Sequence, residues 1–333
     1  MFRNERQFVR WLQKVTPRAR GRIKLGIGDD AALVAVAADR NLVLTTDLFI
    51  EDVHFTRALH PPQSVGHHAL ARSLSDIAAM GGRPRFALLS LALSERTTRA
   101  WIRDFYSAFS ALAKRFGVAV VGGDTAVTRG KALIDVILAG EVAPGRALRR
   151  SGARPGDQIF VSGRLGLSAL GLRLLKSPKH RGRESQSSAE AIRAHLYPEP
   201  QCALGRFLSQ ERIASAAIDV SDGLSTDLSH LCDASGVGAW IGEELIPKPL
   251  DSASRREGDW DPLALALHGG EDYQLLFTVP RHKAHKVPRR FRGVSLHWIG
   301  GIGASKKLVL FRADGMKQTL HPAGWDQFRR QEN

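Results

Sequence analysis

The chain has 333 residues, of which 43% are hydrophobic and 24% charged, an ordinary globular composition that excludes a mostly disordered protein. Its two cysteines, Cys202 and Cys232, exclude a disulfide scaffold and favour a reducing, cytoplasmic location. The net charge of +15 predicts a polyanionic partner, such as nucleic acid or phosphorylated small molecules.

The first half of the chain alternates between the patterns of strands and helices. Hydrophobic periodicity predicts helices over residues 2–15, 64–80 and 98–116, and Gly81-Gly82 ends the second of them. Strands are predicted over residues 41–46, 86–93, 118–121 and 132–142.

The composition shifts to Gly, Pro and Arg over residues 144–157, which predicts a boundary between domains 1–145 and 146–333. The second domain restarts with a strand at 158–162 and a helix at 165–175. Residues 176–189 are polar and basic and are expected to form a surface loop. Further strands are predicted at 214–220, 273–279 and 295–299, with a helix that carries Leu224, Leu228 and Leu231. The expected fold class is therefore α/β or interleaved α+β.

Acidic residues lie beside glycine or at the ends of predicted strands. Carboxylates at strand ends converge at one edge of a sheet, where α/β proteins bind ligands. Such carboxylates repel one another unless hard cations lie between them, and oxygen-rich sites favour Mg²⁺, Mn²⁺ or Ca²⁺. Each segment alone also fits an ordinary turn or helix cap, so the residues leave that alternative open beside a multi-metal, phosphate-handling site. The segments are GIGDD (26–30), TTD (45–47), GGDT (122–125), DVSDG (219–223) and GGED (269–272), with Asp76 in a helix.

Other common sites are excluded by their motifs. The sequence has no Walker A segment, no H-R-D loop, no complete dinucleotide fingerprint and neither C-x-x-C nor H-E-x-x-H. We expect His67, His68, His282 and His285 on the surface, and both cysteines as buried apolar residues.

Taken together, the segments resemble the thiamine-monophosphate kinases, a branch of the aminoimidazole-ribonucleotide-synthetase-like superfamily. The matches follow the family's order, and a C-terminal segment, GWDQF (324–328), resembles the family's last signature. The matching segments are GIGDDAAL (26–33), TTDLFIEDVHF (45–55), ALARSLSDIAAMGGRP (69–84), VGGDT (121–125), RRSGARPGD (149–157), IDVSDGL (218–224) and GGEDYQLLF (269–277).

The resemblance implies transfer of the ATP γ-phosphoryl group onto thiamine monophosphate, the last step of thiamine diphosphate biosynthesis. It implies several Mg²⁺ ions and leaves open whether a monovalent cation is also needed. An N-terminal sheet domain would bind ATP and metal and form a homodimer by joining sheets, and a C-terminal α/β domain would close over nucleotide and substrate. The acceptor phosphate is largely ionised near neutral pH, given a second pKa near ~6, so we predict direct in-line attack and assign no general base.

The resemblance also implies three groups of site residues. The Mg²⁺ ligands are Asp30, Asp47, Asp76, Asp124, Asp219 and Asp222, supported by hydroxyl or carbonyl oxygens of Thr45 and Thr46. The nucleotide contacts are Tyr106, Gly123, Asp124, Arg150 and Ser221, with Arg150 favoured over Arg149 because it directly precedes Ser-Gly. The substrate pocket has His54, Glu271 and Trp325. The sequence departs from the family's pattern at two positions: Ser73, where relatives often have asparagine, and Gly82, where alanine is usual.

Two other functions compete with this interpretation. One is a different ATPase of the superfamily, such as an aminoimidazole-ribonucleotide or selenophosphate synthetase. A selenophosphate synthetase needs a reactive cysteine or selenocysteine near the N-terminus, whereas both cysteines of this chain lie after residue 200. A basic nucleic-acid-binding protein is the other, but the most basic cluster, residues 281–292, contains only one aromatic residue, Phe291. No apolar run approaches the roughly 18–20 residues of a membrane span, and the N-terminus lacks a signal-peptide pattern. We therefore expect neither nucleic acid nor membrane as a partner.

Overall fold

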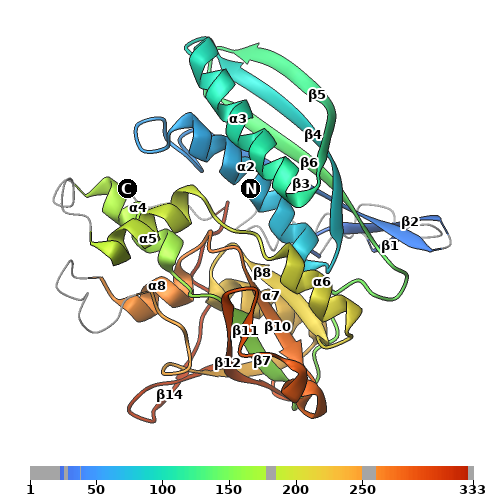
Figure 1. Cartoon of the computed structure of the whole chain (residues 1–333). Coiled ribbons are helices and arrows are strands. Elements are labelled where there is room, and N and C mark those ends of the chain that lie inside the picture. Colours follow the sequence, from blue (N-terminus) through green and yellow to red (C-terminus); the bar gives the residue numbers. More distant parts are fainter. Residues whose placement is uncertain (1–22, 26–28, 38, 178–184, 250–259, 329–333) are drawn as a thin grey trace.

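The computed structural model describes residues 23–25, 29–37, 39–177, 185–249 and 260–328, which form two sheets with helices packed against them (Figure 1). The helix predicted over residues 2–15 and the glycines at positions 26 and 28 lie outside these residues. In the described part of the chain, no helix combines the length and the apolarity needed to cross a membrane.

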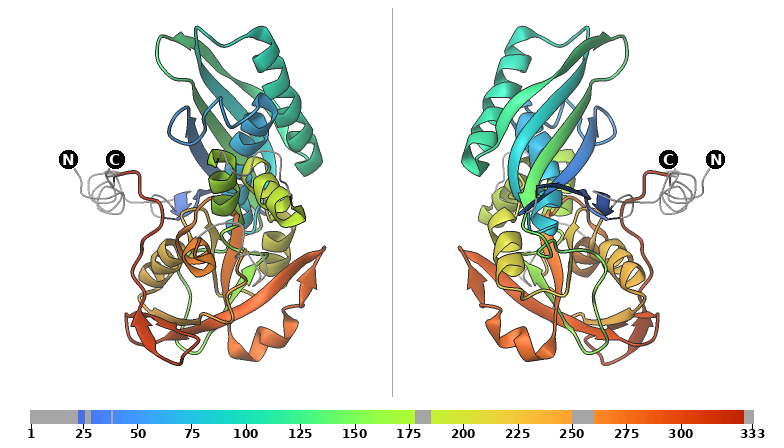
Figure 2. Two further views of the ribbon diagram at one scale, coloured as in Figure 1. Left: turned by 90° about the vertical axis from the view of Figure 1, so that its left-hand side faces the viewer. Right: turned by 90° about the vertical axis from the view of Figure 1, so that its right-hand side faces the viewer.

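The first half of the chain forms a six-stranded sheet in the order β1-β2-β3-β6-β4-β5, in which only β4 and β5 run parallel. The helices α2 and α3 pack against each other on one face of this sheet (Figures 1 and 2). The elements are β1 (Ile23–Leu25), β2 (Ala32–Ala37), β3 (Arg40–Ile50), α2 (Pro62–Ala79), β4 (Arg83–Ser94), α3 (Arg99–Phe116), β5 (Ala119–Thr128) and β6 (Leu133–Val142).

The two helices predicted in this part are confirmed, and their ends have local causes. Helix α2 begins at Pro62, where the missing N–H of proline costs no intrahelical bond. It is followed by Gly81, whose φ of 67° is the left-handed conformation that glycine adopts without strain. Helix α3 begins after Thr98, whose side chain accepts a hydrogen bond from the backbone N–H of Trp101, and it ends at Gly117.

Two strands of this sheet run further than predicted. Strand β3 continues to Ile50, so Asp47 lies within the strand rather than at its end. Strand β5 continues to Thr128 and passes through Gly122 and Gly123. A Cβ atom on Gly123 would lie 1.8 Å from the carbonyl oxygen of Leu89 in β4, so this glycine permits close strand pairing instead of ending the strand.

The second half forms a sheet in the order β14-β13-β9-β12-β7-β10-β8, with β11 added to β12. Strands β9 and β13 pair in parallel, and the other pairs are antiparallel. The elements are β7 (Gln158–Ser162), α4 (Leu167–Lys176), α5 (Gln186–Leu196), α6 (Cys202–Gln210), β8 (Ala216–Val220), α7 (Leu224–Ser235), β9 (Gly238–Gly242), α8 (Pro262–His268), β10 (Gln274–Val279), η3 (Arg281–Lys286), β11 (Arg290–Phe291), β12 (Val294–Gly303), β13 (Leu308–Phe311) and β14 (Lys317–Thr319).

The prediction of a loop over residues 176–189 was wrong at its C-terminal end, because helix α5 begins at Gln186. Its serines resemble loop composition, yet the Ser185 side chain accepts a hydrogen bond from the backbone N–H of Ser188 at 3.2 Å and caps the helix. The strands predicted at 158–162, 214–220, 273–279 and 295–299 are confirmed as β7, β8, β10 and β12.

The two halves share one apolar core at the contact between α2 and α6. A Cβ atom on Gly205 of α6 would lie 1.9 Å from the carbonyl oxygen of Ala78 in α2, so the two backbones touch there. The core extends from Leu74 of α2 to Phe277 of β10. Cys202 and Cys232 are buried, as predicted. This packing places the end of β8 against α2, while the predicted boundary after residue 145 stays a prediction.

Candidate active site

Three carboxylates from distant parts of the chain meet where the two halves join. Asp30 precedes β2, Asp76 lies in the last turns of α2, and Asp219 lies in β8. Each offers an oxygen within 4.8 Å of the others. Asp30 and Asp219 are buried, and Asp76 is partly buried. The structure therefore brings together three of the predicted metal ligands, which we call the acidic trio.

Burial and mutual repulsion shape the chemistry of the acidic trio. Burial raises the pKa of Asp76 well above its usual value, and Asp47, Asp219 and Asp30 raise it further. Burial and the charge of Asp30 likewise raise the pKa of Asp219. Hydroxyl groups orient two of the carboxylates: Thr45 donates to Asp76, and Ser75 donates to Asp219 at 2.7 Å. Close, buried carboxylate oxygens without a thiolate among them are the donor set that a hard divalent cation prefers.

Strand β3 presents its predicted ligands to opposite faces. Thr45 and Asp47 face α2, where Ser73 Oγ donates to Asp47 Oδ2 at 2.9 Å. Thr46 lies on the other face of the strand, and its hydroxyl donates to Asp135 Oδ1 at 2.7 Å. Because successive side chains of a strand alternate in direction, the Thr46 hydroxyl points away from the acidic trio. Either the hydroxyl or the carbonyl oxygen of Thr46 was predicted to support the metal ions. Metal support by the carbonyl oxygen stays a prediction.

Arg150, predicted to contact the nucleotide, is bound to the acidic trio. Its guanidinium group donates to both oxygens of Asp30, with Nε–Oδ2 at 3.2 Å and Nη2–Oδ1 at 2.8 Å. Its backbone N–H also donates to Asp29 Oδ2 at 3.2 Å. Burial and the charge of Asp30 raise the pKa of Asp29 to about 7, while Arg150 opposes this shift. The neighbouring Arg149 is exposed.

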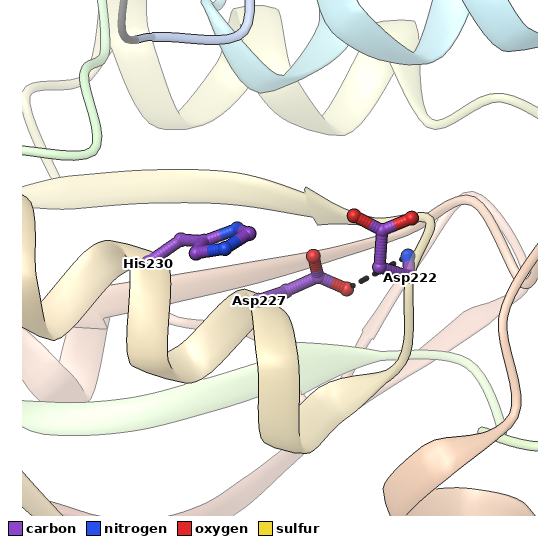
Figure 3. A group of neighbouring side chains, drawn as sticks. All are labelled: Asp222, Asp227 and His230. Atoms are coloured by element: carbon purple, nitrogen blue, oxygen red, sulfur yellow. Dashed lines mark hydrogen bonds between the residues drawn. The ribbon is translucent and has the colours of Figure 1, made fainter. Parts of the chain in front are cut away.

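A second group of ligand-type side chains surrounds Asp222, at the start of α7. Asp222, Asp227 and His230 offer ligand atoms within 4.8 Å of one another, and Figure 3 shows Asp227 and His230 projecting from α7 towards the Asp222 loop. Asp227 accepts hydrogen bonds from the backbone N–H groups of Asp222 at 3.2 Å and Gly223 at 3.0 Å. Sequence reasoning missed Asp227 and His230, although their i, i+3 spacing on a predicted helix places them on one face.

Ser221 and Trp325 lie at the same loop. The Ser221 carbonyl accepts a hydrogen bond from the backbone N–H of Glu271 at 2.7 Å, and the Asp222 carbonyl accepts one from the backbone N–H of Trp325 at 2.9 Å. The indole N–H of Trp325 is buried without a hydrogen-bond partner among the described residues. The structure thus places both Glu271 and Trp325 against the Ser221–Asp222 loop.

Glu271 lies in a buried polar network between the halves. Its Oε1 lies 3.6 Å from His68 Nε2 and 3.6 Å from Arg72 Nη1, and its Oε2 lies 3.6 Å from His195 Nδ1. Burial raises the pKa of Glu271 to about 7, and Arg72 opposes the shift. Glu271 has a φ of 65°, a conformation uncommon for a non-glycine residue, which turns its side chain into this network.

His54 is linked to this network through the ring of Phe49, which packs against both His54 and His68. The Nδ1 of His54 accepts a hydrogen bond from the backbone N–H of Ile50 at 3.0 Å, and its Nε2 is buried without a partner among the described residues. Burial and the charge of Arg72 lower the pKa of His54 to about 4, so the ring is neutral near pH 7. The ring of Phe49 stacks on the His54 ring at 5.8 Å and packs in a tilted arrangement against His68 at 5.0 Å.

The surface position predicted for His68 was wrong, because the side chain is buried beneath α5. The adjacent His67 is partly buried, and its Nε2 lies 2.8 Å from the carbonyl oxygen of Pro198. His68 lies 6.2 Å from the ring of His195, and burial lowers its pKa well below the usual value. Arg72, His68 and His195 therefore join the site. Arg72 lies in the matching segment at residues 69–84, but no site role was predicted for any of the three.

Three predicted residues lie on exposed elements of the first half. Gly123 and Asp124 are exposed on the edge strand β5, where Asp124 Oδ1 accepts a hydrogen bond from the backbone N–H of Thr125 at 2.8 Å. Tyr106 is partly exposed on α3 and packs edge-to-face on Phe105. Strands β6 and β4 separate Asp124 from Asp47, and Asp124 is not among the described carboxylates that meet in the acidic trio. The nucleotide roles of these three residues stay predictions.

Comparison with known proteins agrees with this geometry. Residues 28–142 match the family described as AIR synthase related protein, N-terminal domain, and residues 154–312 match its C-terminal domain. The thiamine-monophosphate kinase of Salmonella typhimurium is 39% identical over 308 residues, 92% of each chain. That of Bacillus subtilis is 35% identical over 324 residues, 96% of this chain and 98% of the relative.

A solved structure has the same fold over nearly the full length. The complex of AaThiL with AMPPCP and TMP superposes with a TM-score of 0.84 at 32% identity and covers 97% of both chains. The resemblance of the sequence segments, the two-sheet fold and these relatives agree, and we conclude that the chain belongs to the thiamine-monophosphate kinase family.

Proposed function

We propose that this protein transfers the γ-phosphoryl group of ATP to the phosphate of thiamine monophosphate and so makes thiamine diphosphate. The observation that carries this proposal is the meeting of Asp30, Asp76 and Asp219 at the junction of the halves. The similarity to kinases named for this substrate, and to a structure complexed with AMPPCP and TMP, supports the choice of substrates.

In the proposed site, Mg²⁺ would be held by the acidic trio and Asp47, with Asp222 as a ligand at the neighbouring loop. When bound, Mg²⁺ would neutralise the phosphates of donor and acceptor, which otherwise repel each other. The side chains of Thr45, Ser73 and Ser75 hold three of these carboxylates in place through hydrogen bonds. Transfer then depends on positioning and charge neutralisation more than on covalent chemistry by the protein.

The acceptor needs no protein base in this proposal. A phosphate monoester has a second pKa near ~6, so its attacking oxygen is already ionised near neutral pH. Glu271 would face the cationic thiazolium ring, which favours the ionised form of this carboxyl. His54 is neutral near pH 7 and so adds no charge that would repel the ring. Trp325 is suited to stack on the ring by cation–π attraction, worth ~0.5–2 kcal/mol.

Purified protein with ATP, thiamine monophosphate and Mg²⁺ is expected to produce thiamine diphosphate, measured by chromatography. Removal of divalent cations with EDTA should abolish the product, because no Mg²⁺ charge is then present to neutralise the two phosphates. Excess Mg²⁺ should restore it. A protein that makes no thiamine diphosphate under these conditions would contradict the proposed function, and full activity in EDTA would contradict the metal-assisted mechanism.

We further propose that two copies of the chain join through the first sheet. The face of this sheet opposite α2 carries exposed apolar side chains, including Leu48, Phe86, Leu88 and Ile137. Its edge strand β5 is exposed along almost its whole length, with Val121 and Val127 among the most exposed apolar residues. An unpaired edge beside an apolar face is a template for pairing, and a second copy offers the same edge and the same face.

Lysine at both exposed valines of β5, in the variant Val121→Lys/Val127→Lys, is expected to convert a dimer into a monomer. Charge on an edge strand opposes pairing with another strand, and burying it in an apolar interface is costly. Light scattering after gel filtration measures the mass of each variant. Met316→Lys, at a similarly exposed apolar residue of the second half, should remain dimeric. A monomeric wild-type chain at micromolar concentration would contradict the dimer.

A further inference from the structure

Arg72 of α2 lies between the acidic trio and the network around Glu271. Its Nη2 is 3.7 Å from Asp47 Oδ1, and its Nη1 is 3.6 Å from Glu271 Oε1. Nη1 also donates to the hydroxyl of Tyr273 at 3.2 Å, and the guanidinium lies over the ring of Phe49 at 5.5 Å. A single cation therefore connects a predicted metal ligand to a predicted substrate-binding residue.

The donors of Arg72 are not satisfied by these partners. Its two carboxylate contacts are longer than the ~2.7–2.9 Å of a charge-assisted hydrogen bond. The buried Nε has no hydrogen-bond partner among the described residues. A guanidinium carries five N–H donors in a rigid fork, and that fork matches the oxygens of a phosphate. Arg72 is thus a buried cation with donors left for an anion.

Opposing effects keep Arg72 charged. Burial acts to lower the pKa of its guanidinium, but Tyr273, Asp47 and Glu271 together raise it above the usual value. The positive charge is therefore permanent in the pH range of the reaction. The side chain is 16% exposed, so it remains within reach of a molecule that enters the site.

The charges of the substrate suggest what Arg72 binds. Thiamine monophosphate has a cationic ring at one end and an anionic phosphate at the other. In the proposed function the ring faces Glu271 and the phosphate lies towards Asp47 and the acidic trio. Arg72 lies between these two places. If Arg72 paired only with Glu271, its positive charge would repel the cationic ring. An anionic group of the same substrate on the Asp47 side would offset that repulsion.

We propose that Arg72 binds the phosphate group of the acceptor and thereby makes the site select thiamine monophosphate over thiamine. The inference rests on the proposed function, and it assigns a substrate-binding role to Arg72, which lies in the matching segment at residues 69–84 but was not among the predicted site residues. An alternative is that Arg72 only positions Glu271. The two roles can be distinguished by experiment. Only direct binding of the phosphate by Arg72 would make substitution of Arg72 weaken thiamine monophosphate more than thiamine.

The test compares binding of thiamine monophosphate and of thiamine to wild type and to Arg72→Gln, by calorimetry with Mg²⁺ present. Loss of a charge-assisted contact to phosphate should weaken the affinity for thiamine monophosphate roughly 10- to 100-fold. The affinity for thiamine should not fall, because thiamine has no phosphate for Arg72 to bind and its cationic ring is repelled by the guanidinium. Arg72→Lys keeps the charge without the fork and should fall between the two.

Arg312→Gln is the matched control, because it removes an arginine that pairs with Glu243 in the second half, remote from α2. It should bind both compounds as wild type does. Equal weakening of both compounds in Arg72→Gln, or no weakening of either, would overturn the proposal. If Arg72→Gln does not fold, the same comparison with Arg72→Lys decides it, with a selective rise in KM for thiamine monophosphate as the expected result. Wild type that neither binds nor phosphorylates thiamine monophosphate would instead contradict the proposed function.

Discussion

Asp219→Asn is expected to lower kcat by roughly 10³-fold, because loss of one anionic ligand removes several kcal/mol of metal-assisted charge stabilisation. Asp219 is only 2% exposed and meets Asp30 and Asp76. Asparagine has nearly the same shape and still offers an oxygen to the Ser75 hydroxyl, which donates to Asp219 Oδ2 in the wild type. The loss of activity would therefore come from the charge and not from a disturbed fold.

The same substitution should stabilise the protein in the absence of metal. Burial and neighbouring carboxylates raise the pKa of Asp219 in the folded state above its unfolded value. A carboxyl of this kind lowers the free energy of unfolding at pH values above its unfolded pKa, where the unfolded chain is ionised, and the loss is recovered as the pH falls. Asparagine carries no such charge, so the metal-free variant should melt at a higher temperature than wild type near pH 8.

Thermal unfolding with EDTA and with Mg²⁺ separates these effects. Mg²⁺ should raise the melting temperature of wild type, since a ligand that binds only the folded state stabilises it, and should have little effect on Asp219→Asn. Asp39→Asn, at an exposed carboxylate that pairs with Arg40, serves as the control and should behave as wild type. A variant that keeps more than about a tenth of the wild-type kcat would contradict the assignment of Asp219 as a ligand.

Arg150→Met is expected to lower the free energy of unfolding of the metal-free protein by about 3–5 kcal/mol, the usual cost of breaking a buried ion pair. Arg150 forms two hydrogen bonds with Asp30, whose side chain has no solvent exposure. Methionine keeps much of the apolar stem but leaves the Asp30 carboxylate buried beside two others. The acidic trio then loses the cation that pairs directly with Asp30 and opposes the repulsion within it.

A second substitution tests that cause. Arg150→Met combined with Asp30→Asn removes the stranded charge and should recover most of the lost stability, as measured by denaturant unfolding in EDTA. Arg150→Lys should lose less than Arg150→Met, because lysine keeps the charge but not the two-pronged contact. A loss below about 1 kcal/mol in Arg150→Met, or a double variant no more stable than the single one, would show that the pair does not carry this energy.

Local signals in the sequence were sufficient for the elements with strong ends. Helix α2 has an apolar stripe and Gly81 after its end, and these local signals predicted a helix over residues 64–80, although it begins two residues earlier at Pro62. The same kind of signal failed at Gly122 and Gly123. Glycine ends many strands, but here the backbone of β4 lies against Gly123, and only the tertiary pairing reveals why a glycine is needed inside the strand.

The acidic residues of the site were recognisable from the sequence because each lies in a short segment with a characteristic pattern of residues. Asp30, Asp76 and Asp219 each lie in a segment that resembles the family, and the structure brings them together. Asp124 lies in an equally recognisable segment, but its strand is at the edge of the sheet. A motif identifies a type of residue, and the order of the strands decides which other residues it can meet.

By itself the sequence determined the alternation of strands and helices, the acidic segments and, through their resemblance, the family. These are properties of neighbouring residues, and periodicity, glycine placement and short motifs record them directly. Only the tertiary structure decided which residues surround the acids: Arg150 on Asp30, Arg72 between Asp47 and Glu271, and His68 buried under α5. Each of these contacts joins segments far apart in the chain, and their energies depend on burial, which no local pattern specifies.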